Sequence, residues 1–175
     1  MSNKKEKILF SEVKYTGKIV GVRVDDVILS DGKEHFREVV EHPGGVVIIP
    51  VLNDNQVVMV RQWRHPVGEE LLEFPAGKLD KADEKPLDAA KRELEEETGF
   101  KANSWEYLGF IYTTPGFCDE KLYLYKAWNL VVSEMMPDYG EIIEKTIIDI
   151  DEVRNMIKIG KITDAKTIVG LSLIS

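Results

Sequence analysis

One segment in the middle of the chain has the boundaries of a helix and a charge pattern that a helix should avoid. Pro86 suits a first helical turn and Gly99 suits the position after the last one, so the sequence predicts a helix over 86–98. The run 93–97 places four glutamates in five positions. Like charges three or four residues apart destabilise a helix, and carboxylates in its last turn oppose the helix dipole. A group outside the helix should therefore neutralise them, and a divalent cation is the obvious candidate.

Strand-length apolar runs lie on both sides of this helix. Runs 46–52 and 57–63 flank the turn 53–55 and predict a hairpin. Further segments extend the pattern, with strands expected at 71–74, 105–112, 121–132 and 146–150 and helices at 151–159 and 164–173. Helices beside a mixed sheet predict a layered α+β or α/β domain.

The first forty residues form a separate β-rich region in this interpretation. The runs 19–24, 27–29 and 36–40 are β-branched or apolar, and Asp31-Gly32 indicates a hairpin. A break at 42–45 follows. We therefore expect an N-terminal β-arm or small sheet over 1–41, which packs against a partner subunit in a homodimer, and a main domain over 42–175. The alternative is that these strands extend the main sheet.

Composition narrows the class of protein. The chain has 175 residues and a formal net charge of −8, which argues against binding nucleic acid by bulk attraction. Its single cysteine, Cys118, allows no intrachain disulfide and fits a reducing compartment. The polar N-terminus does not read as a signal peptide, and no apolar run is long enough to span a membrane. The expectation is a cytoplasmic protein with no membrane partner.

A helical wheel separates the four glutamates. The stripe expected to be buried consists of Leu87, Ala90, Leu94 and Thr98. Glu93 and Glu97 flank this stripe, Glu96 lies further round, and Glu95 points to the opposite side, toward solvent. Arg92 precedes Glu96 by four positions and can pair with it. Three convergent carboxylates suit Mg²⁺ or Mn²⁺, whereas the simpler alternative is a solvated acidic face.

The residues around the helix resemble the Nudix box, here spanning 77–100. The pattern uses Gly77, an acid, and then Arg-Glu, an aliphatic residue, any residue, Glu-Glu, any residue, Gly and an apolar residue, which 92–100 matches in full. One departure lies between Gly77 and Glu84, where six residues intervene rather than five. We interpret it as a one-residue insertion, which leaves open whether Asp83 or Glu84 is the structural acid.

The resemblance implies both a fold and a chemistry. The Nudix fold is an α/β/α-type sandwich, of the α+β class, with a mixed sheet flanked by helices. By the same resemblance, Glu93 and Glu97 are the principal metal ligands, Glu96 assists in catalysis and metal binding, and the Ala76 carbonyl is a further ligand. Arg92 organises the carboxylates. Two or three Mg²⁺ ions per site are implied, with Mn²⁺ as a possible substitute, and they would drain charge from a pyrophosphate and activate water.

A second set of residues resembles the ADP-ribose pyrophosphatase subfamily. Pro115 lies 16 residues beyond Gly99, an offset typical of that subfamily. The segments 61–64, 71–77 and 164–167 are also similar to it. The implied reaction is metal-dependent hydrolysis of ADP-ribose to AMP and ribose 5-phosphate. Two alternatives are a pyrophosphatase for another sugar nucleotide, such as a GDP-hexose, and a non-catalytic sensor that binds ADP-ribose.

Several side chains outside the box are candidates for substrate contact. Arg37 and Arg64 could hold phosphate or ribose, because a guanidinium fits such groups, although either could equally form a surface ion pair. Glu73 is a charged residue in an apolar strand, which is explained by either a site or an outward-facing position. Phe117 could border the ribose or pack under its own loop.

The general base is expected on the loop 137–144 after the box. By the resemblance, this base is a glutamate on a mobile loop. Glu141 follows a glycine and precedes an apolar pair, so it is the first candidate. Glu144 and then Glu120 are the alternatives. A base on a loop can arrive after substrate has bound and water has been excluded.

Overall fold

The chain divides into two compact units in the computed structural model, which describes residues 5–79, 81, 83–136, 140 and 142–174. The first unit combines Met1–Gly44 with Tyr112–Lys121, and the second combines Gly45–Ile111 with Leu122–Ser175. No helix in the described part of the chain is long and apolar enough to span a bilayer.

The first unit is built on an antiparallel sheet of its own. Its strands are β1 (Lys7–Thr16), β2 (Gly21–Ile28) and β3 (Glu34–Glu41), in that order across the sheet. The runs 19–24 and 27–29 fall mostly within the single strand β2. The segment 112–121 joins this unit through backbone hydrogen bonds, since Val40 donates to Phe117 O at 2.7 Å and accepts from the Asp119 N–H at 3.1 Å.

The second unit holds a seven-stranded mixed sheet. The order along it is β10-β5-β4-β9-β8, with the short strand β6 paired to β5 and β7 paired to β4. Strands β4 and β9 run parallel, whereas β5 pairs antiparallel with β4, β6 and β10. The bounds are β4 (Gly45–Asn53), β5 (Gln56–Arg64), β6 (Glu69–Glu73), β7 (Ala76–Lys78), β8 (Phe100–Tyr112), β9 (Lys121–Val132) and β10 (Ile143–Asp149).

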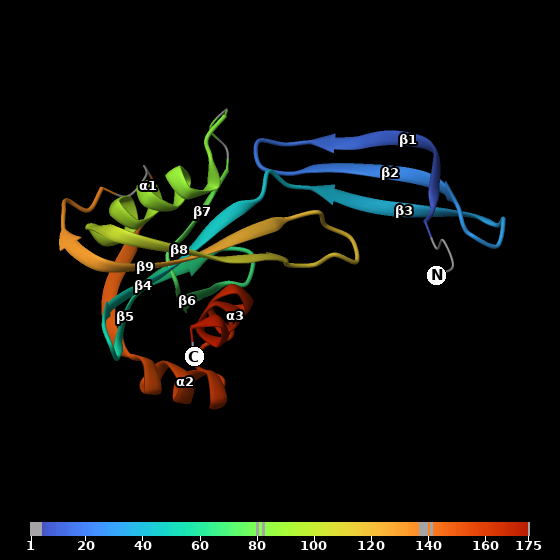
Figure 1. Ribbon diagram of the computed structural model, residues 1–175. Coiled ribbons are helices and arrows are strands. Elements are labelled where there is room, and N and C mark those ends of the chain that lie inside the picture. Colours follow the sequence, from blue (N-terminus) through green and yellow to red (C-terminus); the bar gives the residue numbers. More distant parts are fainter. Residues whose placement is uncertain (1–4, 80, 82, 137–139, 141, 175) are drawn as a thin grey trace. The chain divides into compact units, whose positions relative to one another are not determined.

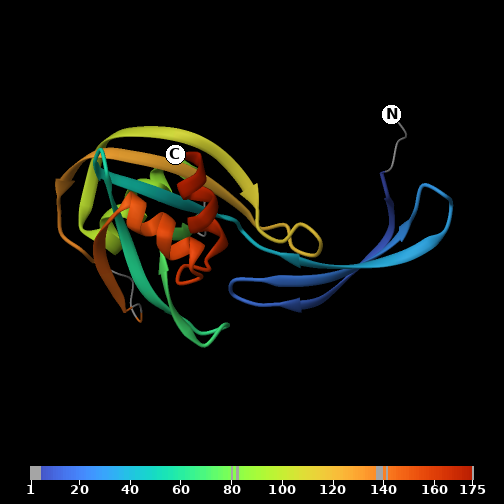
Figure 2. The same cartoon turned by 90° about the horizontal axis from the view of Figure 1, so that it is seen from below.

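The core lies on both faces of β4. Side chains alternate along a strand, so Val46 and Ile48 pack toward α1 (Pro86–Thr98), while Val47 and Ile49 join the cluster formed with α2 (Ile150–Lys158) and α3 (Ala165–Leu173). Figure 1 shows α1 on one face of the sheet and the two later helices on the other, and Figure 2 shows these two helices from below. The four β4 side chains are fully buried, and each contributes about 1.5–3 kcal/mol through burial. This helix–sheet–helix arrangement is the predicted sandwich.

Helix α1 begins and ends where the sequence predicted. The helix spans Pro86–Thr98, with Pro86 in its first turn. Gly99 closes it in the left-handed region at φ 65°, and its N–H bonds to the Glu95 carbonyl. Strand β8 begins directly after this turn, at Phe100 rather than at the expected 105. Helix α2 lies one residue earlier than expected at both ends, and α3 begins one residue later than expected and ends at the expected Leu173.

Candidate active site

Arg92 is the centre of a cluster of carboxylates on α1. Its guanidinium donates to Glu84 through Nε and Nη2 at 3.0 and 3.1 Å, and through Nη1 to Glu93 and Glu96 at 2.7 Å each. The hydrogen bonds to Glu84, and then the charges and hydrogen bonds of Glu93 and Glu96, raise the pKa of Arg92 above its usual range. The pairing of Arg92 with Glu96 and its role as organiser of the carboxylates were predicted; its two hydrogen bonds to Glu84 were not.

The two hydrogen bonds from Arg92 to Glu84 indicate that Glu84, and not Asp83, is the structural acid. Glu84 receives both bonds from Arg92, and these bonds hold the pKa of Glu84 below its usual 4.5. Asp83 instead adopts φ 61°, in the left-handed region that aspartate tolerates better than most residues. Glu84, and not Asp83, is therefore the acid that pairs with Arg92, despite the extra residue after Gly77.

The lowered pKa of Glu84 predicts a pH-dependent contribution to stability. A carboxyl with a depressed folded-state pKa stabilises the fold above its unfolded pKa and loses this effect as pH falls through the folded value. We expect Glu84→Gln to lower the free energy of unfolding by about 1–2 kcal/mol at pH 7, and the gap from wild type to shrink as the pH falls below 4.5, the usual value for glutamate. Urea unfolding at pH 7 and over a series of acid pH values measures this difference. Glu106→Gln, on an exposed position of β8, is the matched control; an E84Q gap that persists unchanged in acid would contradict the assignment.

Gly77 lies directly against the carboxylate of Glu93. A Cβ built on Gly77 would fall 1.9 Å from Glu93 Cδ and 2.0 Å from its Oε1. Only glycine leaves this space, so β7 and α1 approach at the carboxylate itself. One residue earlier, the Ala76 N–H donates to Glu97 Oε2 at 3.1 Å, and Glu97 is only 3% exposed. The strand β7 is therefore aligned with two of the α1 glutamates.

The expected metal ligands have a donor chemistry that fits a divalent cation. Carboxylate oxygens of low exposure beside a glycine backbone are hard ligands in a restricted space. In this conformation Glu93 and Glu96 turn to Arg92, and Glu97 bonds to the Ala76 N–H. Among the described residues no group of three or more acids, histidines or cysteines is arranged to enclose an ion. The ligand set Ala76, Glu93, Glu96 and Glu97 stays a prediction.

Glu95 is separate from this cluster, as the helical wheel indicated, but it is half-buried against two partners rather than turned to solvent. It accepts a hydrogen bond from Ser133 Oγ at 2.6 Å and pairs with Lys101 at 2.9 Å. The Ser133 bond, and then Lys101, hold the pKa of Glu95 below its usual range. These two partners reduce the repulsion that the sequence places in the helix.

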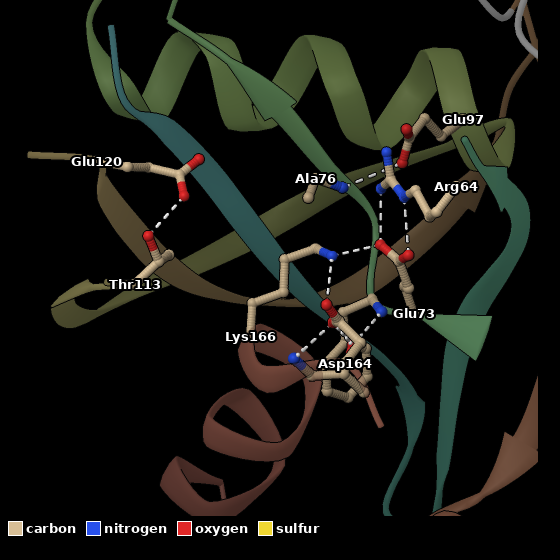
Figure 3. A network of polar contacts seen from close by, with 10 residues as sticks. Arg64, Glu73, Ala76, Glu97, Thr113, Glu120, Asp164 and Lys166 are labelled. Carbon is tan, nitrogen blue, oxygen red and sulfur yellow. Dashed lines mark hydrogen bonds and ion pairs between the residues drawn. The ribbon is translucent and has the colours of Figure 1, made fainter. Parts of the chain in front are cut away.

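A second polar network lies at the end of β6. Glu73 is 1% exposed and accepts from Arg64 Nε at 2.8 Å and Nη2 at 2.6 Å (Figure 3). Burial by itself raises the pKa of Glu73, but the Arg64 bonds and the charge of Lys166 outweigh it and leave the pKa below its usual range. Two of the four candidates for substrate contact, Arg64 and Glu73, thus form an ion pair with each other.

The network continues into the first turn of α3, which sequence reasoning did not select as part of the site. Lys166 Nζ donates to Glu73 and, at 2.9 Å, to Asp164. Asp164 caps α3 by accepting from the Thr167 N–H at 3.0 Å, and Thr167 Oγ1 accepts from the Phe74 N–H at 2.9 Å. The motif 164–167 was noted only for its family resemblance, and its contacts lie 93 residues away in sequence.

The two remaining substrate candidates meet at a cavity in the first unit. Arg37 forms a two-bond pair with Glu6 at 3.0 and 2.6 Å, and Phe117 is 56% exposed. Both line a cavity of about 470 Å³, together with Glu6, Glu38, Val39, Tyr112, Pro115, Gly116, Cys118 and Asp119. The Pro115 segment that marks the subfamily resemblance therefore forms part of this wall.

The candidate bases have different surroundings. Glu141 lies outside the described residues. Glu144 is exposed on β10, opposite Arg61 of β5. Glu120 accepts from Thr113 Oγ1 at 2.6 Å, which Figure 3 also draws, and lies 3.5 Å from His42 Nδ1. The identity of the base stays a prediction.

Comparison with known proteins establishes the class. The model of the NUDIX domain matches residues 41–168. An ADP-ribose pyrophosphatase of Bacillus subtilis is 37% identical over 95% of this chain and 91% of its own length. A methanol dehydrogenase activator of Bacillus methanolicus is 40% identical over 95% of this chain and 90% of its own. The chain belongs to the Nudix family and is a Nudix hydrolase.

A solved structure confirms the fold independently of close sequence similarity. The crystal structure of an ADP compounds hydrolase superposes with a TM-score of 0.87 at 23% identity, and the match covers 99% of this chain and 94% of that one. The α+β sandwich expected from the Nudix resemblance is therefore correct.

Proposed function

We propose that this protein hydrolyses the diphosphate bond of ADP-ribose, giving AMP and ribose 5-phosphate, with a divalent metal. One observation carries the proposal. The Arg92 cluster and the Gly77–Glu93 approach place the Nudix glutamates beside β7 in a protein whose relatives include ADP-ribose pyrophosphatases. The mycobacterial relative of that name is 44% identical over 69% of this chain.

Different residues of the chain have different roles in the proposed reaction. Glu93, Glu96, Glu97 and the Ala76 carbonyl would hold Mg²⁺ or Mn²⁺, which supplies charge neutralisation and an activated water when bound. Arg92 orients the carboxylates by its three-way pairing. The number of ions, two or three, is carried over from the family resemblance.

Substrate binding is assigned to two groups of side chains. Arg64 and Glu73 form the polar network of the second unit, and Arg37 and Phe117 line the cavity of the first. Guanidinium groups suit phosphate oxygens, and an exposed aromatic ring suits the face of a sugar or base. Glu141 is the proposed general base, with Glu144 and Glu120 as alternatives.

The second candidate substrate is another sugar nucleotide. GDP-mannose pyrophosphatases of Yersinia enterocolitica and Cronobacter sakazakii are 31% identical over 79% and 83% of this chain, and over 76% and 82% of their own lengths. The retained Arg92 and its glutamates argue against a third reading, a non-catalytic sensor, because a sensor needs no organised carboxylates.

A panel of sugar nucleotides separates these readings. ADP-ribose, ADP-glucose and GDP-mannose are incubated with Mg²⁺, and phosphatase-coupled phosphate release is measured. We expect the highest kcat/KM with ADP-ribose and no release in EDTA. Preference for GDP-mannose would replace the substrate assignment, and absence of turnover with every compound would refute both enzymatic readings.

We also propose a cytoplasmic homodimer joined through the first unit, with no nucleic-acid or membrane partner. Strand β1 is exposed along its whole length and presents apolar side chains, among them Phe10 at 60% and Val13 at 64%. A second copy would cover this strand. Sedimentation of the protein as a monomer would refute the proposal.

A further inference from the structure

Glu73 receives more positive charge than a single ion pair requires. Its carboxylate is 1% exposed and is bound by Arg64 and by Lys166. A buried carboxylate needs its charge compensated and its oxygens hydrogen-bonded, and Arg64 and Lys166 supply these together. Lys166 therefore shares with Arg64 the compensation of Glu73.

Sharing Glu73 matters for Arg64, because Arg64 lies between two carboxylates. Its hydrogen bonds to Glu73 raise its pKa, and the charges of Glu97 and Asp164 act in the same direction. Figure 3 shows the guanidinium between the carboxylates of Glu73 and Glu97. Arg64 is 34% exposed, so it is the member of the network that solvent and substrate can reach.

We infer that Lys166 is a positioning residue: by sharing Glu73, it holds Arg64 available for the phosphate groups of the substrate. The inference rests on the proposed function. Lys166 is 13% exposed and is itself held by Asp164, so the shared charge is fixed in place by the first turn of α3. Lys166 acts through Glu73, and no direct contact with substrate is assigned to it.

Charge balance gives the physical effect. With Lys166 present, Arg64 and Lys166 balance Glu73 and Asp164. Without it, the network gains one net negative charge, and Arg64 alone compensates the buried Glu73. The Arg64 guanidinium is then bound more tightly to Glu73, and the charge around it is more negative. Both changes weaken the binding of an anionic substrate.

The first test is Lys166→Met, with Lys161→Met as the matched control on an exposed lysine nearby in sequence. With ADP-ribose and Mg²⁺, we expect K166M to raise KM at least tenfold while kcat changes less than threefold. K161M should leave both within twofold. If K166M does not fold, as judged by circular dichroism and Tm, Lys166→Gln removes the charge and keeps a hydrogen-bond donor. A KM within twofold of wild type for the folded variant would overturn the inference.

A double-mutant cycle separates positioning from direct contact. If Lys166 acts through Glu73, then adding Lys166→Met to Glu73→Gln should change KM less than twofold, whereas it changes KM tenfold in the wild-type background. Effects of Lys166→Met that are equal in both backgrounds would overturn the inference, because they would indicate contact with the substrate.

A readout without substrate keeps the inference distinct from the proposed function. The Arg64 Nε–H signal in the ¹⁵N spectrum of the metal-free protein reports the bond to Glu73. We expect K166M to shift this signal and slow its exchange with water, and K161M to leave it unchanged. If wild type hydrolyses no sugar nucleotide but the signal responds, the function is wrong and the Lys166–Arg64 coupling stands. An unchanged signal in K166M overturns the coupling itself.

Discussion

Replacing Glu97 by glutamine is expected to lower kcat for ADP-ribose by at least about 100-fold while the protein stays folded. Glu97 is 3% exposed and bonded to the Ala76 N–H, so the amide can keep the hydrogen bond but not the charge that would bind a cation. Phosphate release measures kcat. Isothermal titration with Mn²⁺ measures the lost metal affinity without turnover.

Glu95→Gln is the matched control, since it makes the same change two residues away on the same helix. Glu95 turns to Ser133 and Lys101, away from β7. We expect E95Q to keep at least half of the wild-type kcat. Without metal, E97Q should melt within a few degrees of wild type, because the substitution also relieves repulsion among the glutamates. If E97Q retained more than a tenth of the activity, Glu97 would not be a principal ligand.

The second large effect is expected from a single methyl group at Gly77. In Gly77→Ala the new carbon would lie 1.9 Å from Glu93 Cδ, so the carboxylate must leave its place on Arg92. A displacement of about 1 Å in a catalytic site can cost about 100-fold in rate, and we expect kcat/KM to fall by about that factor. Steady-state kinetics with ADP-ribose measures it.

A glycine in the first unit provides the comparison for this substitution. In Gly21→Ala the nearest foreign atom is the end of the Glu41 side chain at 3.2 Å, which can rotate away. Activity should therefore stay within twofold of wild type. If G77A retained full activity with Glu93 still paired to Arg92, the close approach of β7 and α1 would not govern the site.

Local signals explain which parts of the fold could be predicted. The ends of α1 were predicted exactly because Pro86 and Gly99 are adjacent to the residues that they control. The hairpin of β4 and β5 followed from two apolar runs around a turn. Strand β7 was not foreseen, because three residues carry no detectable period and this strand depends on pairing with β4.

The same distinction between local signals and long-range pairing applies to the site. The glutamates and Arg92 are encoded within a few residues of one another, so a helical wheel could group them. Arg92 was expected to pair with Glu96 and to organise the carboxylates, and it binds both Glu93 and Glu96. The cation expected to neutralise the glutamates from outside the helix stays a prediction. The role of Lys166 depends on an ion pair to Glu73, 93 residues earlier, and no pattern in one sequence reports such a pairing.

The contacts between α3 and β6 also have a consequence for the order of folding. Forming a contact between distant residues requires closing a long loop, and such contacts slow folding more than local ones do. Thr167 and Phe74 are 93 residues apart, whereas the hydrogen bonds within α1 join residues only a few positions apart. The helix that carries the glutamates can therefore form early, while the bond between Phe74 and Thr167 forms only after α3 has docked. A substitution that slows this docking would reduce the yield of active enzyme without altering any residue that meets the substrate.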